Sequence, residues 1–203
     1  MKGSYRFYRC CYRIARAGIA VVYRLDISGR ENIPEGAVMV CANHSSTIDP
    51  VLLAFAFGID HFLHVVAKKE LFRIPVLSVI IKGLGAISVD REVSDVGTVR
   101  SMLTHLKSGD KVVIFPEGTR VSKDDAVSAK SGAVKIAERA KVPLLPVFIP
   151  RKKPFFRKLT IVIGENYCIE KHEGKLSPED YNMLADVLMG KIKALDPDMR
   201  VSA

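Results

Sequence analysis

The stretch that decides the fold is Ala37-Val38-Met39-Val40-Cys41, followed after one residue by Asn43-His44-Ser45-Ser46-Thr47-Ile48-Asp49-Pro50. A short apolar run rich in β-branched residues, bounded by Gly36 and Asn43, is typical of a buried strand. His44 therefore comes just after the end of a strand. Loops in that position commonly carry the reactive side chains of a rigid scaffold.

His44 and Asp49 form a candidate catalytic pair. Four residues separate them, which is enough for a tight turn that brings the carboxylate back to the ring. Asp49 would then accept a hydrogen bond from one ring nitrogen and leave the other free to take a proton. The same residues also fit an ordinary helix start, with Asp49 as N-cap and Pro50 in the first helical position. Both interpretations can hold together, because a capping aspartate is rigidly placed.

Strands and helices alternate along the rest of the chain. The apolar patterns predict strands at residues 25–29, 37–41, 62–66, 86–89, 111–115, 144–149 and 159–163. They predict helices at residues 5–24, 51–57, 76–81, 95–107, 130–140 and 178–194. The helix at 76–81 is apolar nearly all round, so we expect it to be buried or to face lipid. The alternation predicts one α/β sandwich domain over residues 25–203, with a mixed, largely parallel sheet.

The first 24 residues are predicted to form an amphipathic helix. Its arginines recur at steps of three, four and three and so share one stripe: Arg6, Arg9, Arg13 and Arg16. The longest charge-free run, Ala17 to Tyr23, is far short of the roughly 20 residues that span a bilayer. We expect a helix lying in the membrane interface, with Tyr8, Tyr12 and Ile14 adding apolar contact. The alternative is a surface helix packed on the domain.

Composition narrows the class of partner. The chain has 203 residues, 48% of them hydrophobic, and a formal net charge of +9, which favours an anionic partner. No nucleic-acid-binding motif occurs and there is no Trp, so we expect a lipid surface or a phosphorylated substrate instead. The cysteine spacing fits no zinc site, and the other histidines have no matching acidic or cysteine framework: His61, His64, His105 and His172. No metal is expected, and His64 is expected to pack on its strand.

Three further motifs follow in order after His44 and Asp49. They are Gly85-Ala86-Ile87-Ser88-Val89-Asp90-Arg91, Phe115-Pro116-Glu117-Gly118-Thr119-Arg120 and Val142-Pro143-Leu144-Leu145-Pro146-Val147. The four-part series resembles the conserved blocks of the glycerolipid acyltransferases, most closely the lysophosphatidate acyltransferases. The resemblance covers residues 24 to 164, and four motifs in this order are far more specific than any one of them.

The resemblance implies a role for each motif. It implies that His44 is the general base, oriented by Asp49, and that the substrate phosphate is bound by Arg91, Glu117, Gly118, Thr119, Arg120 and Lys130. Arg120 offers a planar fork suited to phosphate, and Glu117 is expected to orient Arg120 or to contact a substrate hydroxyl. Lys130 opens a predicted helix, whose N-terminus favours phosphate. Many family members carry an aromatic residue before this lysine, where this chain has Ala129.

The expected activity is transfer of a fatty acyl group to the sn-2 hydroxyl of 1-acyl-sn-glycerol 3-phosphate (lysophosphatidic acid), giving phosphatidic acid. The acyl donor would be acyl-CoA or acyl carrier protein, with no cofactor. We expect a peripheral or monotopic protein on the cytoplasmic face of the cell membrane. A loop with two adjacent rings, Phe155 and Phe156, would give the anionic surface a second contact. The alternatives are an enzyme acting on glycerol 3-phosphate or another lysolipid, and a non-catalytic basic membrane-binding protein.

Overall fold

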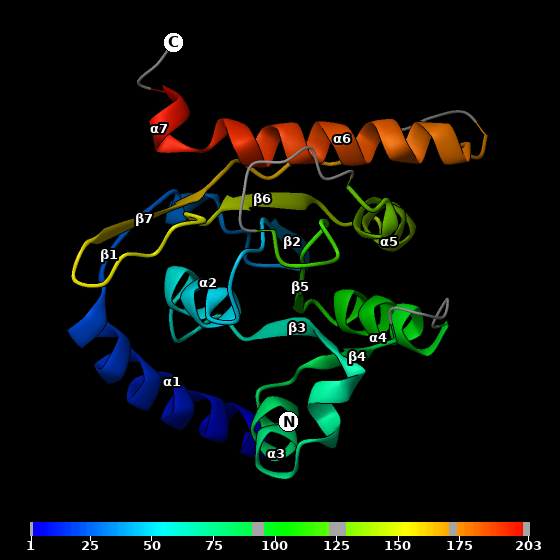
Figure 1. Cartoon of the computed structure of the whole chain (residues 1–203). Helices are drawn as coiled ribbons and strands as arrows, with labels where there is room; N and C mark the ends of the chain where they lie inside the picture. The colour runs from blue at the N-terminus through cyan, green and yellow to red at the C-terminus, as the bar shows by residue number, and fades with distance from the viewer. Residues whose placement is uncertain (1, 91–95, 122–128, 171–173, 201–203) are drawn as a thin grey trace.

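The computed structural model describes residues 2–90, 96–121, 129–170 and 174–200. Its centre is a seven-stranded sheet with the order β1-β7-β6-β2-β5-β3-β4 (Figure 1). The strands are β1 (Arg24–Ser28), β2 (Val38–Ala42), β3 (Leu63–Lys68), β4 (Ile87–Val89), β5 (Lys111–Ile114), β6 (Leu144–Phe148) and β7 (Lys158–Ile163). Neighbouring strands pair in parallel except β6 with β7. The predicted mixed, largely parallel sheet is confirmed.

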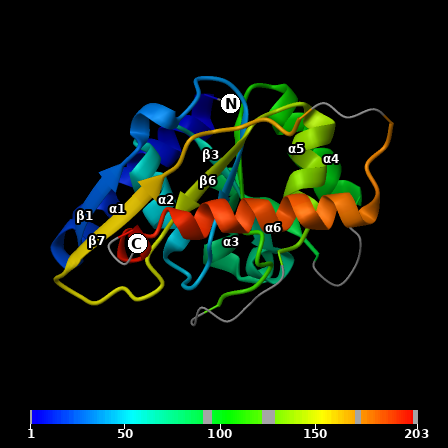
Figure 2. The ribbon, with the colours of Figure 1, turned by 90° about the horizontal axis from the view of Figure 1, so that it is seen from above.

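Helices cover both faces of the sheet. They are α1 (Lys2–Val22), α2 (Asp49–Phe57), α3 (Pro75–Gly83), α4 (Val96–Lys107), α5 (Gly132–Ala140), α6 (Pro178–Ala194) and α7 (Pro197–Arg200), with 3₁₀ turns η1 (Arg30–Asn32) and η2 (Lys69–Arg73). One face is covered by α2, with α1 outside it, and the other by α4, α5 and α6. Figure 2 shows α6 crossing the molecule; α5 packs against α6, and α4 packs against α5.

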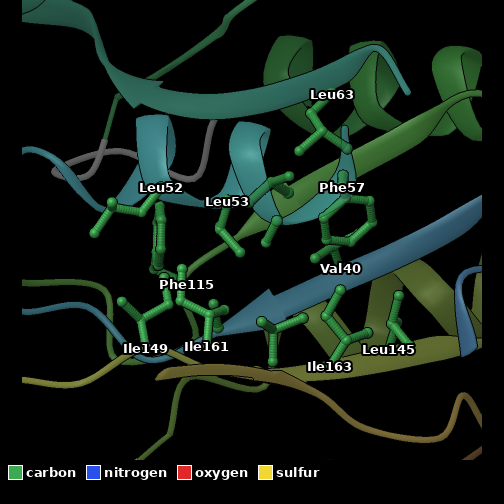
Figure 3. Close-up of a cluster of buried hydrophobic side chains, with 14 of the residues drawn as sticks. Val40, Leu52, Leu53, Phe57, Leu63, Phe115, Leu145, Ile149, Ile161 and Ile163 are labelled. Carbon is green, nitrogen blue, oxygen red and sulfur yellow. The ribbon is translucent and has the colours of Figure 1, made fainter. Parts of the chain in front are cut away.

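The central strand β2 is buried along its whole length. Its alternate side chains enter two different cores, because successive residues of a strand point to opposite faces. Val40 packs beneath α2 against Leu53 and Phe57 (Figure 3). Met39 and Cys41 pack on the other face, under α4, α5 and α6. Burial on both faces is why this strand reads as a continuous apolar run in the sequence.

The N-terminal helix is present, but part of its expected membrane face is wrong. Tyr8 and Tyr12 are buried against the domain rather than turned outward, and Tyr12 meets Phe55 of α2 edge-on at 5.1 Å between ring centroids. The Tyr8 hydroxyl donates to the carbonyl of His61 at 3.0 Å. The helix therefore packs on the domain through its tyrosines, which leaves a different face exposed.

The short helix α3 is not buried. Val76 and Val79 are 74% and 67% exposed, and among its described residues only Ser78 is buried. Of the two expectations from its apolar sequence, burial is therefore excluded. No helix in the described part of the chain is long and apolar enough to cross a membrane.

Candidate active site

Three adjacent parallel strands bring the candidate residues together. β2 lies between β5 and β6 and runs parallel to both, so the carboxyl ends of all three strands meet at one edge of the sheet. His44 follows β2, Glu117 follows β5 and Arg151 follows β6. Open α/β sheets bind their ligands outside the carboxyl ends of their strands. This edge is the place where a reactive site is expected.

His44 and Asp49 lie in hydrogen-bond contact. The distance from His44 Nδ1 to Asp49 Oδ2 is 2.9 Å. With Nδ1 protonated and donating to the carboxylate, the lone pair is on Nε2, which can then accept a proton. The imidazole also stacks on Phe115, with ring centroids 4.1 Å apart and planes inclined by 21°. The ring is thus held from its edge and from its face.

Asp49 is fully buried and tightly surrounded. Its Oδ2 also accepts from the backbone N–H groups of Ser45 and Ser46, at 2.7 and 2.8 Å, and its Oδ1 lies 2.9 Å from Lys153 Nζ. Burial raises the pKa of this carboxyl, but the hydrogen bonds and the Lys153 ammonium outweigh burial and hold the pKa below its ordinary value. Asp49 is therefore an anion at neutral pH.

The helix start differs by one residue from the expectation. Ile48 is the N-cap of α2, and Asp49 is its first residue. The carboxylate does not cap its own helix. It satisfies the N–H groups of the preceding turn instead, and so closes the loop that carries His44.

Backbone contacts fix this loop to its neighbours. The Asn43 side chain exchanges two hydrogen bonds with the backbone of Ile149, at 2.7 and 2.8 Å, which joins the ends of β2 and β6. The backbone N–H of Val121 donates to the His44 carbonyl at 2.7 Å, which joins the loops after β2 and β5. His44 is therefore held by three segments that are far apart in sequence.

Glu117 has a different partner from the one expected. Its Oε2 accepts from the His44 backbone N–H at 3.0 Å, and its Oε1 accepts from the Arg151 guanidinium at 2.5 Å. Arg151 also donates to the Val121 carbonyl at 2.8 Å. Glu117 is buried and pairs with Arg151 rather than orienting Arg120. Its carboxylate thus holds the loop that carries His44.

The turn at Gly118, Thr119 and Arg120 opens to solvent. Gly118 has φ +67°, which favours glycine, and a Cβ there would meet the aliphatic carbons of Lys130 at 2.7 and 2.8 Å. Lys130 therefore lies across the turn, and its backbone N–H donates to the Pro116 carbonyl at 2.8 Å. Thr119, Arg120 and Lys130 are exposed, so their polar groups are available to an anionic ligand.

Known proteins are similar to this chain in sequence. The model of the family described as Acyltransferase matches residues 24–150. A 1-acyl-sn-glycerol-3-phosphate acyltransferase of Bacillus subtilis (strain 168) is 31% identical over 196 residues, which cover 93% of this chain and 96% of that protein. Its counterpart in Borreliella burgdorferi is 30% identical over 178 residues, or 83% of this chain and 67% of that protein.

The chain belongs to the acyltransferase family.

A solved structure agrees with this assignment. The crystal structure of the 1-acyl-sn-glycerophosphate (LPA) acyltransferase PlsC from Thermotoga maritima matches with a TM-score of 0.68 at 26% identity. The match covers 95% of this chain and 80% of that one. The α/β fold with its N-terminal helix is therefore the fold of this acyltransferase family.

One residue predicted for the phosphate site of the acyltransferase, Arg91, lies outside the described residues. Its neighbour Asp90 follows β4 and forms an ion pair with Lys69, the first residue after β3. Both strands run parallel to β5, so this pair belongs to the same edge of the sheet as His44. The structure thus gathers His44, Asp49, Glu117, Gly118, Thr119, Arg120 and Lys130 at one edge.

Two residues of the site escaped the sequence analysis. The sequence analysis assigns no role to Arg151 or Lys153, yet Arg151 bonds Glu117 and Lys153 pairs with Asp49. Lys153 Nζ also donates to Ser45 Oγ and to the Pro150 carbonyl, both at 2.7 Å. A signal was present, because this loop follows the end of a predicted strand, as His44 and Glu117 do.

A separate hollow lies away from this chemistry. It has a volume of about 440 Å³ between β7 and the C-terminal end of α6, and Gly29, Ile163, Lys191 and Leu195 are among its lining residues. None of the residues of the candidate site lines it. The candidate site is therefore distinct from this hollow.

Proposed function

We propose that this acyltransferase transfers a fatty acyl group from acyl-CoA or acyl carrier protein to the sn-2 hydroxyl of 1-acyl-sn-glycerol 3-phosphate, giving phosphatidic acid. The observation that carries the proposal is the placement of the His44–Asp49 pair beside an exposed turn with Arg120 and Lys130. A base next to two cations suits an alcohol that carries a phosphate. The names of relatives that match along nearly the whole chain support the same acceptor.

The proposed chemistry needs one base and no covalent enzyme intermediate. His44 Nε2 removes the proton of the acceptor hydroxyl as its oxygen attacks the thioester carbonyl carbon. The carbon–sulfur bond then breaks, and the leaving thiolate takes the proton from the imidazolium. The Asp49 anion stabilises that imidazolium through Nδ1. The thioester is already activated, so base catalysis and orientation account for the step.

The proposed phosphate site is the turn after β5. Arg120, on the turn, supplies a planar pair of donors, and Lys130, which lies across the turn, supplies an ammonium; both residues are exposed. Glu117 does not face this ligand, because both its oxygens are bonded within the protein. Glu117 therefore contributes to the proposed phosphate site only indirectly, because it holds the loop from which Gly118 to Arg120 project.

The test is a panel of acceptors with the purified protein. Release of free thiol from an acyl thioester is followed with 1-acyl-sn-glycerol 3-phosphate, glycerol 3-phosphate, lysophosphatidylcholine and lysophosphatidylethanolamine, and without an acceptor to measure hydrolysis. We expect the fastest release with 1-acyl-sn-glycerol 3-phosphate, with either acyl-CoA or acyl carrier protein as donor. Preference for glycerol 3-phosphate or for a phosphodiester lysolipid would overturn the acceptor. No release above hydrolysis with any acceptor would support the non-catalytic alternative.

We propose further that the enzyme works at the surface of an anionic membrane, since its acceptor and product are lipids. On α1, Phe7, Ile14 and Val21 recur every seven residues on the side away from the buried tyrosines, and Ile14 and Val21 are 70% and 72% exposed. Arg6 and Arg13 flank this stripe and are exposed. An exposed apolar stripe beside arginines fits a helix that lies in a negatively charged interface.

Exposed apolar groups also lie at both ends of α1. Near its start, Phe7 packs against Gly83 of α3. Two other residues of α3, Val76 and Val79, are exposed. At its end, the Val22 carbonyl accepts from the backbone N–H of Phe156 at 2.8 Å, and Phe155 and Phe156 are exposed. Figure 1 shows α1 spanning from α3 to the loop before β7. Three weak contacts on one rigid body reinforce each other through effective concentration.

Vesicle sedimentation tests this surface. One variant reverses the exposed arginines (Arg6, Arg13 and Arg16 to Glu), and a second removes the loop rings (Phe155→Ser with Phe156→Ser). Arg9 stays unchanged, because it lies 3.8 Å from Asp60 and belongs partly to the fold. We expect both variants to bind anionic vesicles more weakly at low salt, and the arginine variant to lose the salt sensitivity of binding. Wild-type binding by both folded variants would refute this surface.

A further inference from the structure

A second polar cluster lies on the other side of the sheet from α2. His64 is in β3, His105 is in the last turn of α4, and Asp110 precedes β5. Asp110 Oδ2 lies 3.4 Å from His64 Nε2 and 2.9 Å from His105 Nδ1. One ligand atom from each side chain lies within 4.8 Å of the other two. The sequence analysis found no acidic partner for these histidines, and Asp110 is that partner.

Backbone contact fixes the His64 ring and its tautomer. His64 Nδ1 lies 2.9 Å from the Gly85 carbonyl oxygen, so Nδ1 carries the proton and donates it. Gly85 has φ +71°, and a Cβ there would lie 2.5 Å from the Phe62 ring and 3.0 Å from His64 Nδ1, so the Gly85 backbone lies close to both rings. A histidine whose second nitrogen donates to a carbonyl is in the usual arrangement of a metal ligand.

The fixed tautomer leaves two electron-rich atoms close together. His64 Nε2, which carries no proton, lies 3.4 Å from Asp110 Oδ2. A cation bound by both atoms relieves their repulsion.

We propose that His64 Nε2, His105 Nδ1 and Asp110 Oδ2 bind a divalent transition metal, of which Zn²⁺ fits the donor set best. Zinc bonds to imidazole nitrogen and carboxylate oxygen are about 2.0–2.1 Å, so tetrahedral ligands stand about 3.3 Å apart. The two separations to Asp110 bracket that distance. His105 and Asp110 are about one third exposed, so an ion reaches the site from solvent and water completes its coordination.

The site is separate from the catalytic edge. His64 is the second residue of β3 and Asp110 immediately precedes β5, so the cluster lies at the amino ends of these parallel strands. His44 lies beyond the carboxyl end of β2, which runs parallel to β5. The bound ion would tie β3, α4 and β5 together, and it takes no part in acyl transfer.

Chelator-treated full-length protein, its His105→Gln and Asp110→Asn variants, and a His61→Gln control are titrated with ZnCl₂ by calorimetry. His105 and Asp110 are substituted because they are partly exposed, whereas His64 is buried. We expect one zinc site in wild type and in the control, a tenfold or greater loss of affinity in each ligand variant, and zinc-dependent thermal stabilisation only where zinc binds. Co²⁺ should give a visible spectrum of low coordination number. No binding, or equal binding by all four proteins, overturns the proposal.

Discussion

Two histidine–aspartate pairs among the described residues have the same spacing and the same contact. In both His44–Asp49 and His105–Asp110 the residues are five positions apart, and Nδ1 lies 2.9 Å from Oδ2. Their surroundings differ. Asp49 is fully buried and also holds two backbone N–H groups and an ammonium, whereas the side chain of Asp110 is 37% exposed and faces a second histidine.

The difference separates the pair that we propose to be catalytic from the other pair. Spacing sets only whether the two side chains can meet. Position on the sheet decides what each pair can act on. His44 shares the carboxyl edge of the sheet with Glu117 and Arg120, whereas His105 lies in the last turn of α4, at the amino edge. The buried anion at Asp49 can stabilise an imidazolium, while Asp110, between two imidazoles, is arranged to share a cation.

Matching substitutions in the two aspartates give the largest contrast. Asp49→Asn removes the anion that fixes the His44 tautomer and stabilises the imidazolium, so we expect kcat to fall by roughly 10²–10³. Asp110→Asn should leave kcat within about twofold, because that residue lies outside the site. Thiol-release kinetics on both variants, with folding checked by circular dichroism, measures this. Equal losses in the two would show that position on the sheet does not separate the pairs.

A smaller contrast separates Arg120, on the exposed turn of the candidate site, from an exposed arginine elsewhere on the surface. If Arg120 binds the substrate phosphate as proposed, Arg120→Ala removes a charged hydrogen bond worth on the order of 1.5–3 kcal/mol. We expect KM for 1-acyl-sn-glycerol 3-phosphate to rise tenfold or more, with KM for the thioester little changed. Arg139→Ala, in the last turn of α5, is the matched control. A rise confined to the thioester would reverse the assignment of the two subsites.

The smallest effect concerns the ammonium beside Asp49. The pKa of Asp49 is lowered in the folded protein, so its contribution to stability is present above its ordinary pKa and is lost as pH falls through the lowered value. Lys153→Met removes one cause of that lowering, so the variant should unfold at higher pH than wild type in acid titrations. Lys152→Met, next to it and exposed, is the control. Coincident acid transitions for all three proteins would contradict the role of Lys153.

Much of the fold could be predicted because it rests on local patterns. Helix α6 begins at Pro178 as predicted, and Ser177 and Asp180 form its capping box, with bonds of 2.8 and 3.1 Å. The largely parallel sheet was predictable because the alternation of strands and helices is also a local pattern. Strand order was not predictable from these patterns, because pairing of β1 with β7 depends on contacts between distant segments.

The site was predictable only where motifs carry it. His44 and Asp49 lie in one loop, so their meeting follows from the sequence. The pairing of Glu117 with Arg151 and of Asp49 with Lys153 joins loops 34 and 104 residues apart, which no local pattern indicates. The outward turn of Ile14 and the burial of Tyr8 likewise depend on which face of α1 meets Phe55 and Phe62.

The most direct measurement compares thiol release by His44→Ala and His105→Ala under identical conditions, with 1-acyl-sn-glycerol 3-phosphate as acceptor. Loss of the base should lower kcat by roughly 10²–10⁴ in His44→Ala. His105→Ala should keep near wild-type turnover, although its histidine makes the same 2.9 Å contact with an aspartate. A folded His44→Ala protein that turns over at the wild-type rate would contradict the assignment of His44 as the general base.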